Sequence, residues 1–188
     1  MADEHGVSAV TMASLAGSLG VTPMALYQHV KGKDHLLSLM MDHILRPIEV
    51  PPRSFGPWYE RLRRLHTEVV AAMARYPGMG NVRVTPQENT RLLEGYLQIL
   101  LDAGFDPATA GLAFTGLYHL AIGAQTPYHG AASPAMLPPP GPSFPAIATV
   151  APAVADVDPE SWRTHALDVY IEGLRKLHRK IGGSRTQR

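Results

Sequence analysis

Hydrophobic residues recur every three or four positions along most of this chain, and no stretch shows the sustained apolar–polar alternation of a strand. This period predicts helices over 58–75, 87–103, 107–125, 145–155 and 159–181. Gly104 ends the second of these, and Asp106 and Asp158 are suited to cap the third and the last. The fold class is therefore expected to be all-α. On the first long helix the inward face is expected to carry Leu62, Leu65, Val69, Ala72 and Met73, with Arg61, Arg64, Glu68 and Arg75 mostly elsewhere.

Residues 11–41 predict two short helices joined by a tight turn and followed by a longer helix. Gly20 ends the first helix, because a residue without Cβ adopts the left-handed conformation at little cost. Thr22 and Pro23 are typical of a helix start, so the second helix begins at once. This is a helix-turn-helix arrangement. Thr11 is expected to cap the first helix, and Val21 is expected to fill the turn. The residues expected to face inward are Leu15, Ala16, Leu19, Leu26 and Val30. Those expected to face outward are Met24, Ala25, Gln28 and His29, with Tyr27 at the flank.

The segment LAGSLGVTPMALYQHVKGKDHLL, residues 15–37, strongly resembles the TetR family of bacterial transcriptional repressors. The rest of the chain looks, more loosely, like the tetracycline-repressor-type C-terminal domain, with Trp58 opening its first helix and an Ala-Gly-Phe turn at 103–105. The resemblance implies a helix-turn-helix domain over 1–47 and an effector-binding and dimerisation domain over 53–182, with a proline-rich loop at 126–142. It also implies a homodimer that represses transcription from a palindromic double-stranded DNA operator and is released by a small-molecule effector.

The resemblance also implies roles for individual residues of the second motif helix and its flanks. Side chains with suitable donors lie where the family contacts phosphate: Thr22, Tyr27, His29 and Lys33, with Lys31 helping by charge. Pro23, Met24, Ala25 and Gln28 lie where base edges are read, and of these only Gln28 can make a bidentate contact, which favours adenine. The plainer interpretation of this set is a solvated helix surface.

For the effector, the candidates are aromatic or adaptable side chains, although each also suits an ordinary core position. They are Trp58, Met73, Met79, Tyr96, Tyr118 and His119. Small residues, including Gly111, Gly116 and Gly123, suit helix 107–125 to close packing with the last helix. Two alternatives stay open for this pair: a dimer interface, which the family favours, or a core within one chain. The apolar period expected along the last helix runs over Trp162, Ala166, Val169, Tyr170, Gly173, Leu174, Leu177 and Ile181.

Two departures from the family pattern bear on DNA binding. Ala13 and Ser14 stand where many members carry basic residues, and residues 1–50 hold three basic side chains against five acidic ones, a balance of −2. The family also has a full helix before the motif, and this chain has no room for one, so we expect that upstream residues are missing. The face of Leu36, Met40 and Ile44 would then lose a packing partner. An alternative function follows: a small-molecule-binding dimer without operator binding.

Composition and missing motifs exclude several classes of protein function. The formal net charge is +1, and the absence of cysteine excludes a disulfide scaffold, a thiolate metal site and a cysteine nucleophile. The nine histidines include no HExxH pair, and His165 and His178 are expected at the surface or a helix end. No GxSxG or GK[ST] motif is present, and Gly78–Val82 is a poor dinucleotide loop. We therefore expect that the protein is not an enzyme, that it binds no cofactor or metal, and that it is located in the cytoplasm. Residues 107–125 have the length of a membrane span, but polar interruptions and missing basic flanks favour a helix buried on most sides.

Overall fold

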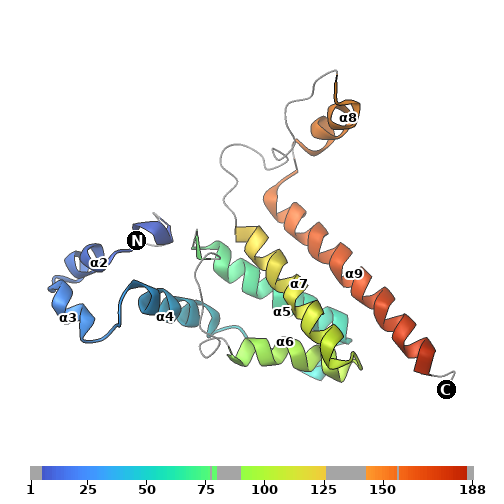
Figure 1. Ribbon diagram of the computed structural model, residues 1–188, viewed down its shortest axis with the longest axis horizontal. Helices are drawn as coiled ribbons and strands as arrows, with labels where there is room; N and C mark the ends of the chain where they lie inside the picture. Colours follow the sequence, from blue (N-terminus) through green and yellow to red (C-terminus); the bar gives the residue numbers. More distant parts are fainter. Residues whose placement is uncertain (1–5, 77, 80–89, 126–142, 156, 186–188) are drawn as a thin grey trace.

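The computed structural model describes residues 6–76, 78–79, 90–125, 143–155 and 157–185. The described residues form helices and contain no strand, which confirms the all-α class. Figure 1 shows an elongated molecule, with a small N-terminal head followed by a bundle. The proline-rich segment 126–142 and most of the Gly78–Val82 stretch lie outside the described residues, and the domain boundaries stay a prediction.

The head consists of short helices with their own small core. The 3-10 helix η1 spans Val7–Ala9, α2 spans Met12–Leu19 and α3 spans Pro23–Tyr27. The predicted caps are present: the Thr11 side chain accepts from the backbone of Ser14, and the Thr22 side chain accepts from Ala25. The buried cluster joins Met12 and Ala16 of α2 to Leu26 and Val30, with Leu15 and Leu36 packed against it. The capping residues therefore determine where α2 and α3 begin, and the small apolar cluster holds the two helices together.

Two apolar residues beside the turn are not inward, contrary to expectation. Leu19 is 59% exposed and Val21 is 44% exposed. The chain bends at Gly20, which adopts φ 67° and ψ 27°, and the bend brings Ala16 rather than Leu19 against α3. An eight-residue helix can present only about two turns to a neighbour, so its last residue lies beyond the contact.

Helix α4, Lys33–Leu45, connects the head to the bundle and belongs to both cores. Its fully buried stripe is Leu37, Met41 and Leu45, one position away from the stripe expected from sequence. Leu36, Met40 and Ile44 are half-buried: Leu36 packs on the head cluster and the other two pack on the main core. These three residues therefore lie at the rim of contacts that the described chain itself supplies.

The bundle is built from α5 (Trp58–Ala74), α6 (Thr90–Asp102), α7 (Pro107–Gln125) and α9 (Pro159–Arg185). Helix α5 packs against α4, α6, α7 and α9, so it lies at the centre (Figure 1). Its predicted face is buried at Leu62, Leu65, Val69 and Met73, while Ala72 is half-buried. A short 3-10 helix, η2 (Arg53–Phe55), precedes it, and α8 (Pro145–Val154) stands away from the bundle with no buried residue.

Polar side chains on α5 correct the simple amphipathic picture. Arg61 is buried, because its Nε donates to the backbone oxygen of Pro51 at 3.0 Å in the chain that leads into α5. His66 is buried as well and lies beside Tyr96 of α6. His178 of α9, expected at the surface or a helix end, is half-buried between Trp58 and Phe105, with Nε2 2.7 Å from the backbone oxygen of Ala103.

The last helices differ from the expected burial in one systematic way: each keeps an apolar face in water. On α7 the buried residues include Ala110, Ala113 and Leu117, whereas Leu112 is 74% exposed, so this helix is not buried on most sides. On α9 the buried stripe is Leu167, Ile171 and Leu174. Much of the expected apolar period is instead exposed, namely Trp162, Ala166, Val169, Gly173 and Leu177. One face of α9 meets α5 and α7, and the other has no partner among the described residues.

Two predicted helix starts in this region are confirmed. The Asp106 carboxylate accepts hydrogen bonds from Thr109 and Ala108 at the start of α7, and Asp158 does the same for Ser161 and Glu160 at the start of α9. The hydrogen bond from the Ser161 hydroxyl is the main reason that the pKa of Asp158 lies below its ordinary value. Within the described residues no helix, α7 included, has the length and apolarity that crossing a bilayer requires.

Candidate nucleic-acid interface and effector cavity

The outer face of α3 is exposed, as the sequence predicts. Met24 is 73% exposed and Tyr27 is 54% exposed, while Gln28 and His29 also face solvent. Pro23 occupies the first turn of α3, and Ala25 is half-buried. Only Leu26 of this helix is buried, and it holds α3 against α2. The head therefore presents a short helix whose outer side chains are available for contact (Figure 1).

Cationic and hydroxyl groups flank this face. Lys31, which follows α3, and Lys33, the first residue of α4, are exposed and make no ion pair with the described residues. Thr22 is exposed at the other end of α3, although its hydroxyl oxygen already accepts the capping hydrogen bond. The third basic residue of segment 1–50, Arg46, follows the last residue of α4 and pairs with Asp42 at 3.0 Å. Two lysines per chain thus provide the free positive charge near α3.

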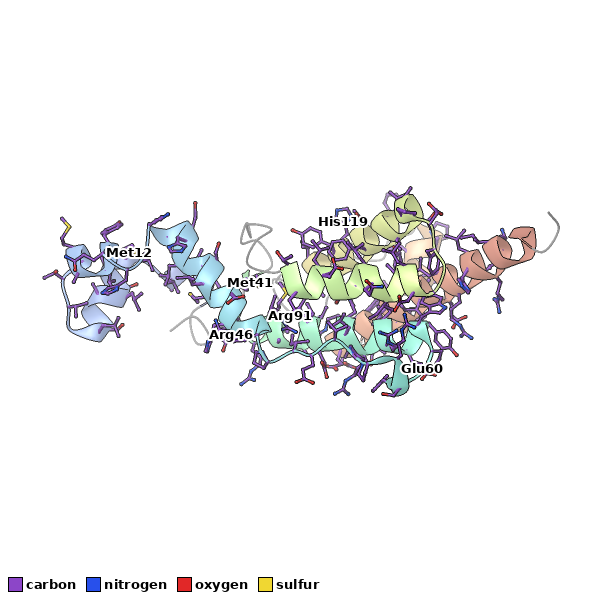
Figure 2. The ribbon with its side chains drawn as sticks, turned by 90° about the horizontal axis from the view of Figure 1, so that it is seen from below. Met12, Met41, Arg46, Glu60, Arg91 and His119 are labelled. Carbon is purple, nitrogen blue, oxygen red and sulfur yellow. The ribbon has the colours of Figure 1, made fainter. Side chains whose placement is uncertain are left out.

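The connection between α4 and the bundle runs along one face of α6. Arg91 donates through Nη2 to the backbone oxygens of Arg46 at 3.2 Å and of Ile48 at 2.7 Å, so it caps the carbonyl end of α4. Figure 2 shows Arg46 and Arg91 beside each other at this junction. One turn further along α6, Gly95 is in contact with Val50, whose methyl groups occupy the space that a Cβ would need.

The same face of α6 ends on an ion pair. Arg53 pairs with Asp102 at 2.8 Å, and a hydrogen bond from Gln98 is the largest cause of the lowered pKa of that carboxyl group, with Arg53 next. Positions 91, 95 and 102 lie on one side of a helix, because they are separated by four and seven residues. The connecting segment is thus attached to α6 along nearly the whole helix.

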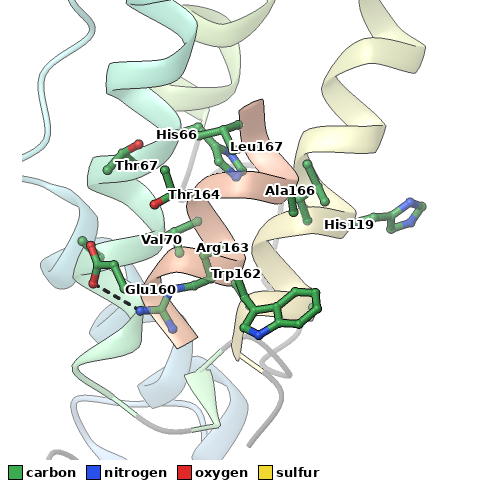
Figure 3. A pocket seen from close by; sticks show the side chains of 14 residues that line it. His66, Thr67, Val70, His119, Glu160, Trp162, Arg163, Thr164, Ala166 and Leu167 are labelled. Atoms are coloured by element: carbon green, nitrogen blue, oxygen red, sulfur yellow. Dashed lines mark hydrogen bonds and ion pairs between the residues drawn. The ribbon is translucent and has the colours of Figure 1, made fainter. Parts of the chain in front are cut away.

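A cavity of about 450 Å³ lies between α5, α7 and the beginning of α9. Figure 3 shows side chains from these helices around it, with His66 and Leu167 at one end and Trp162 and Arg163 toward the other. Most of the wall is apolar, and the remaining groups are two hydroxyls, two imidazoles, one guanidinium and one carboxylate. The lining comprises His66, Thr67, Val70, Ala71, His119, Leu120, Gly123, Ala124, Glu160, Trp162, Arg163, Thr164, Ala166 and Leu167. Its size falls within the range of small-molecule sites.

Of the six effector residues expected from sequence, His119 lines this cavity and the other five lie elsewhere. Met73, Met79 and Tyr96 are buried in the main core. Trp58 packs edge-on against Phe105 at the opposite end of α7. Tyr118 is 51% exposed beside Phe114. Ligand contact by these residues stays a prediction.

Sequence reasoning missed the groups that give the cavity its chemistry. His66 carried a usable signal, because it interrupts the apolar face formed by Leu62, Leu65 and Val69. Burial lowers the pKa of His66 to about 4, so its imidazole is uncharged at neutral pH. Arg163 and Trp162 carried no such signal, since only the packing of α9 on α5 and α7 brings them to the cavity.

Comparison with known proteins decides the fold. A possible TetR family transcriptional regulator from Streptomyces coelicolor A3(2) superposes with a TM-score of 0.82 at 25% identity, over 93% of either chain. The chain has the fold of the TetR family. Apo ActR from Streptomyces coelicolor shares this TetR fold with a TM-score of 0.79 at 22% identity, over 96% of this chain and 91% of ActR. The structure of ActR in complex with actinorhodin superposes with a TM-score of 0.73 at 23% identity, over 94% of this chain and 91% of ActR.

A curated sequence relative is a transcriptional repressor of the helix-turn-helix type. The HTH-type transcriptional repressor DrrR1 of Streptomyces coeruleorubidus is 37% identical over 78 residues, which cover 41% of this chain and 29% of DrrR1. No family model matches the chain. The resemblance read from residues 15–37 is thus confirmed, and the relatives found are transcriptional regulators. The described residues hold no cluster of three or more histidine, aspartate or glutamate side chains placed to bind a metal ion.

Proposed function

We propose that this chain is a DNA-binding transcriptional repressor that acts in the cytoplasm as a homodimer on a palindromic operator. The observation that carries the proposal is the outer face of α3, which is exposed along its length behind the bend at Gly20 and is flanked by Lys31 and Lys33. An α-helix of this kind fits the major groove of duplex DNA, with phosphate contacts on either side. The relationship to DrrR1 supports the same conclusion.

Within this proposal each residue has a physical role. Gln28 reads a base edge and favours adenine, while Pro23, Met24 and Ala25 make apolar contacts such as with a thymine methyl group. Thr22, Tyr27, His29, Lys31 and Lys33 contact the phosphate backbone and set the register. Sequence specificity therefore depends chiefly on Gln28, because it is the only group in the base-reading set with two hydrogen-bonding atoms at its end.

A gel-shift assay with the DNA upstream of the protein's own gene tests this function. We expect a shift that Gln28→Ala weakens by about fivefold or more, since a bidentate base contact is worth ~1–3 kcal/mol of discrimination. Gln98→Ala is the matched control, because Gln98 is exposed on α6 and its amide donates only to Asp102. Intact helicity with no shift at low salt would contradict the proposal and favour a ligand-binding dimer instead. The comparisons do not favour that alternative.

The dimer is proposed to form through the uncovered faces of α7 and α9. Val169 of α9 is 59% exposed and Leu112 of α7 is 74% exposed, on helices that already pack together within one chain. Two such pairs can bury these faces in a four-helix interface. Val169→Glu should give a monomer in sedimentation, whereas Val21→Glu in the head should leave the dimer intact. A dimer that tolerates Val169→Glu would rule out this face.

The effector is proposed to bind in the cavity between α5, α7 and α9 and to lower operator affinity. ActR has been crystallised with actinorhodin, a small-molecule ligand, in the same fold. A ligand can release the operator only if it binds the DNA-incompetent conformation more tightly. The linkage of α4 to α6 through Arg91 gives a physical route from the bundle to the head.

A further inference from the structure

The cavity carries one cationic group on a wall that is otherwise mainly apolar. Arg163 projects from the first turns of α9, and its side chain is 31% exposed (Figure 3). The apolar lining comes from all three helices and includes Val70, Leu120 and Leu167. A positive charge beside a large apolar surface suits a ligand that combines an apolar body with one negative charge. A positively charged group on the ligand would be repelled by the Arg163 guanidinium.

Most of the hydrogen-bonding capacity of Arg163 is unused. Its recorded contact is with Glu160, whose Oε2 lies 3.4 Å from Nη2, a distance beyond the usual range for this bond. The Glu160 side chain is 80% exposed, so it can turn into water at small cost. A guanidinium has five N–H donors in a flat fork that matches a carboxylate. The free donors are therefore suited to a planar, singly charged acid.

Uncharged polar groups of the lining come from His66, Thr67 and Thr164. His66 is buried and uncharged, and Nδ1 lies 3.5 Å from the Tyr96 hydroxyl while Nε2 makes no hydrogen bond to the described residues. The Thr67 and Thr164 hydroxyls are likewise without a hydrogen bond in the described part of the chain, and Trp162 presents a ring at the mouth. These groups can pair with a hydroxyl or carbonyl and stack on a flat ring.

We propose that the cavity binds a flat aromatic carboxylate, with the carboxylate on Arg163, the ring system against Trp162 and the apolar wall, and a polar substituent at His66. The inference rests on the proposed function only in treating this cavity as the effector site. Arg163 and Trp162 would select the ligand, and the ligand carboxylate would replace Glu160 as the hydrogen-bond acceptor of Arg163. A phosphate dianion fits less well, because the lining offers a single cation.

Three naphthalene derivatives with the substituent at the same ring position test the proposal by titration calorimetry on the full chain. They are naphthoate, its neutral amide naphthamide and the cationic naphthylmethylammonium. We expect naphthoate to bind about tenfold or more tightly than naphthamide, as for a charge-assisted hydrogen bond. The cation should bind least. Arg163→Gln should abolish the preference for naphthoate, and Arg163→Lys should keep part of it, since it keeps the charge and loses the fork.

The matched control is Arg175→Gln. Arg175 lies three turns further along α9, outside the cavity, and pairs with Glu172 in the same i,i+3 arrangement as Arg163 with Glu160. It should leave the preference unchanged, and circular dichroism should show equal helicity in all variants. Equal binding of the three compounds, no binding of any, or an unchanged preference in Arg163→Gln would each overturn the inference. The operator assay is independent, so a chain that binds DNA but ignores naphthoate refutes only the ligand class.

Discussion

The positive charge near α3 determines how strongly DNA affinity should depend on salt concentration. Lys31 and Lys33 carry free positive charge beside the face of α3 that we propose to contact DNA, so the proposed dimer would bring four such lysines to the operator. Each neutralised phosphate adds about −0.9 to the slope of log affinity against log salt concentration. The expected slope is therefore about −3.6, which corresponds to an affinity loss of about 150-fold between about 50 and about 200 mM salt.

Lys33→Gln removes two of these charges from the dimer and should reduce the slope to about −1.8. The affinity loss over the same salt range then falls to about 12-fold. Fluorescence anisotropy with a labelled operator duplex measures both values, at a pH well above the ordinary range of histidine titration so that lysine alone is counted. The Lys33 substitution should weaken all DNA sequences alike, because phosphate contacts carry no sequence information.

Arg46→Gln is the control for net charge. Its guanidinium is already paired with Asp42 and lies about 20 Å from Lys33 along α4, beyond the Debye length at physiological salt. The slope of this variant should equal that of the unmodified protein. If Lys33→Gln leaves the slope unchanged, or if Arg46→Gln reduces it equally, the assignment of the phosphate contacts is wrong.

Three further predictions concern stability. The pKa of His66 is about 4 in the folded protein and 6.5 in the unfolded one, so the unfolded state binds more protons between these values. The free energy of unfolding should therefore fall by up to ~3 kcal/mol as the pH drops from about 7 to 4. In urea titrations, His66→Gln should flatten this decline. Arg91→Ala should cost ~1 kcal/mol and speed amide exchange at the end of α4, because two hydrogen bonds to carbonyls are lost; unchanged exchange there would refute the role of Arg91. Gly20→Ala should lower the thermal midpoint through ~1–2 kcal/mol of left-handed strain, unlike Gly17→Ala within α2, where open space surrounds the new methyl group.

The helix-turn-helix could be predicted because its signals are local. Thr11, Gly20, Thr22 and Pro23 each determine a backbone conformation at their own position, and the structure places all four as expected. The exposed face of α3 followed from the same reasoning. Leu19 was placed wrongly because its burial depends on the angle at which α3 leaves the turn, and a helical period contains no information about that angle.

The cavity could not be predicted because its parts are distant in sequence. His66 and Arg163 are almost a hundred residues apart and meet only through the packing of α9 on α5. Buried Arg61 is similar: an arginine on a mixed helix is expected in water unless its partner, here the Pro51 carbonyl, is known. Conversely, the apolar period of α9 predicted burial that one chain does not provide, since Val169 and Leu177 are exposed.

The attachment of the connecting segment along α6 has a mechanical consequence. Helix α4 is a rigid rod of 13 residues, about 20 Å long, held at its carbonyl end by Arg91 and carrying α3 at its other end. A tilt of about 5° at the held end would displace the far end by nearly 2 Å, on the scale of a hydrogen bond's tolerance. In a dimer the two rods would swing in opposite directions, so small movements of α6 would change the spacing between the paired reading helices by roughly twice that amount.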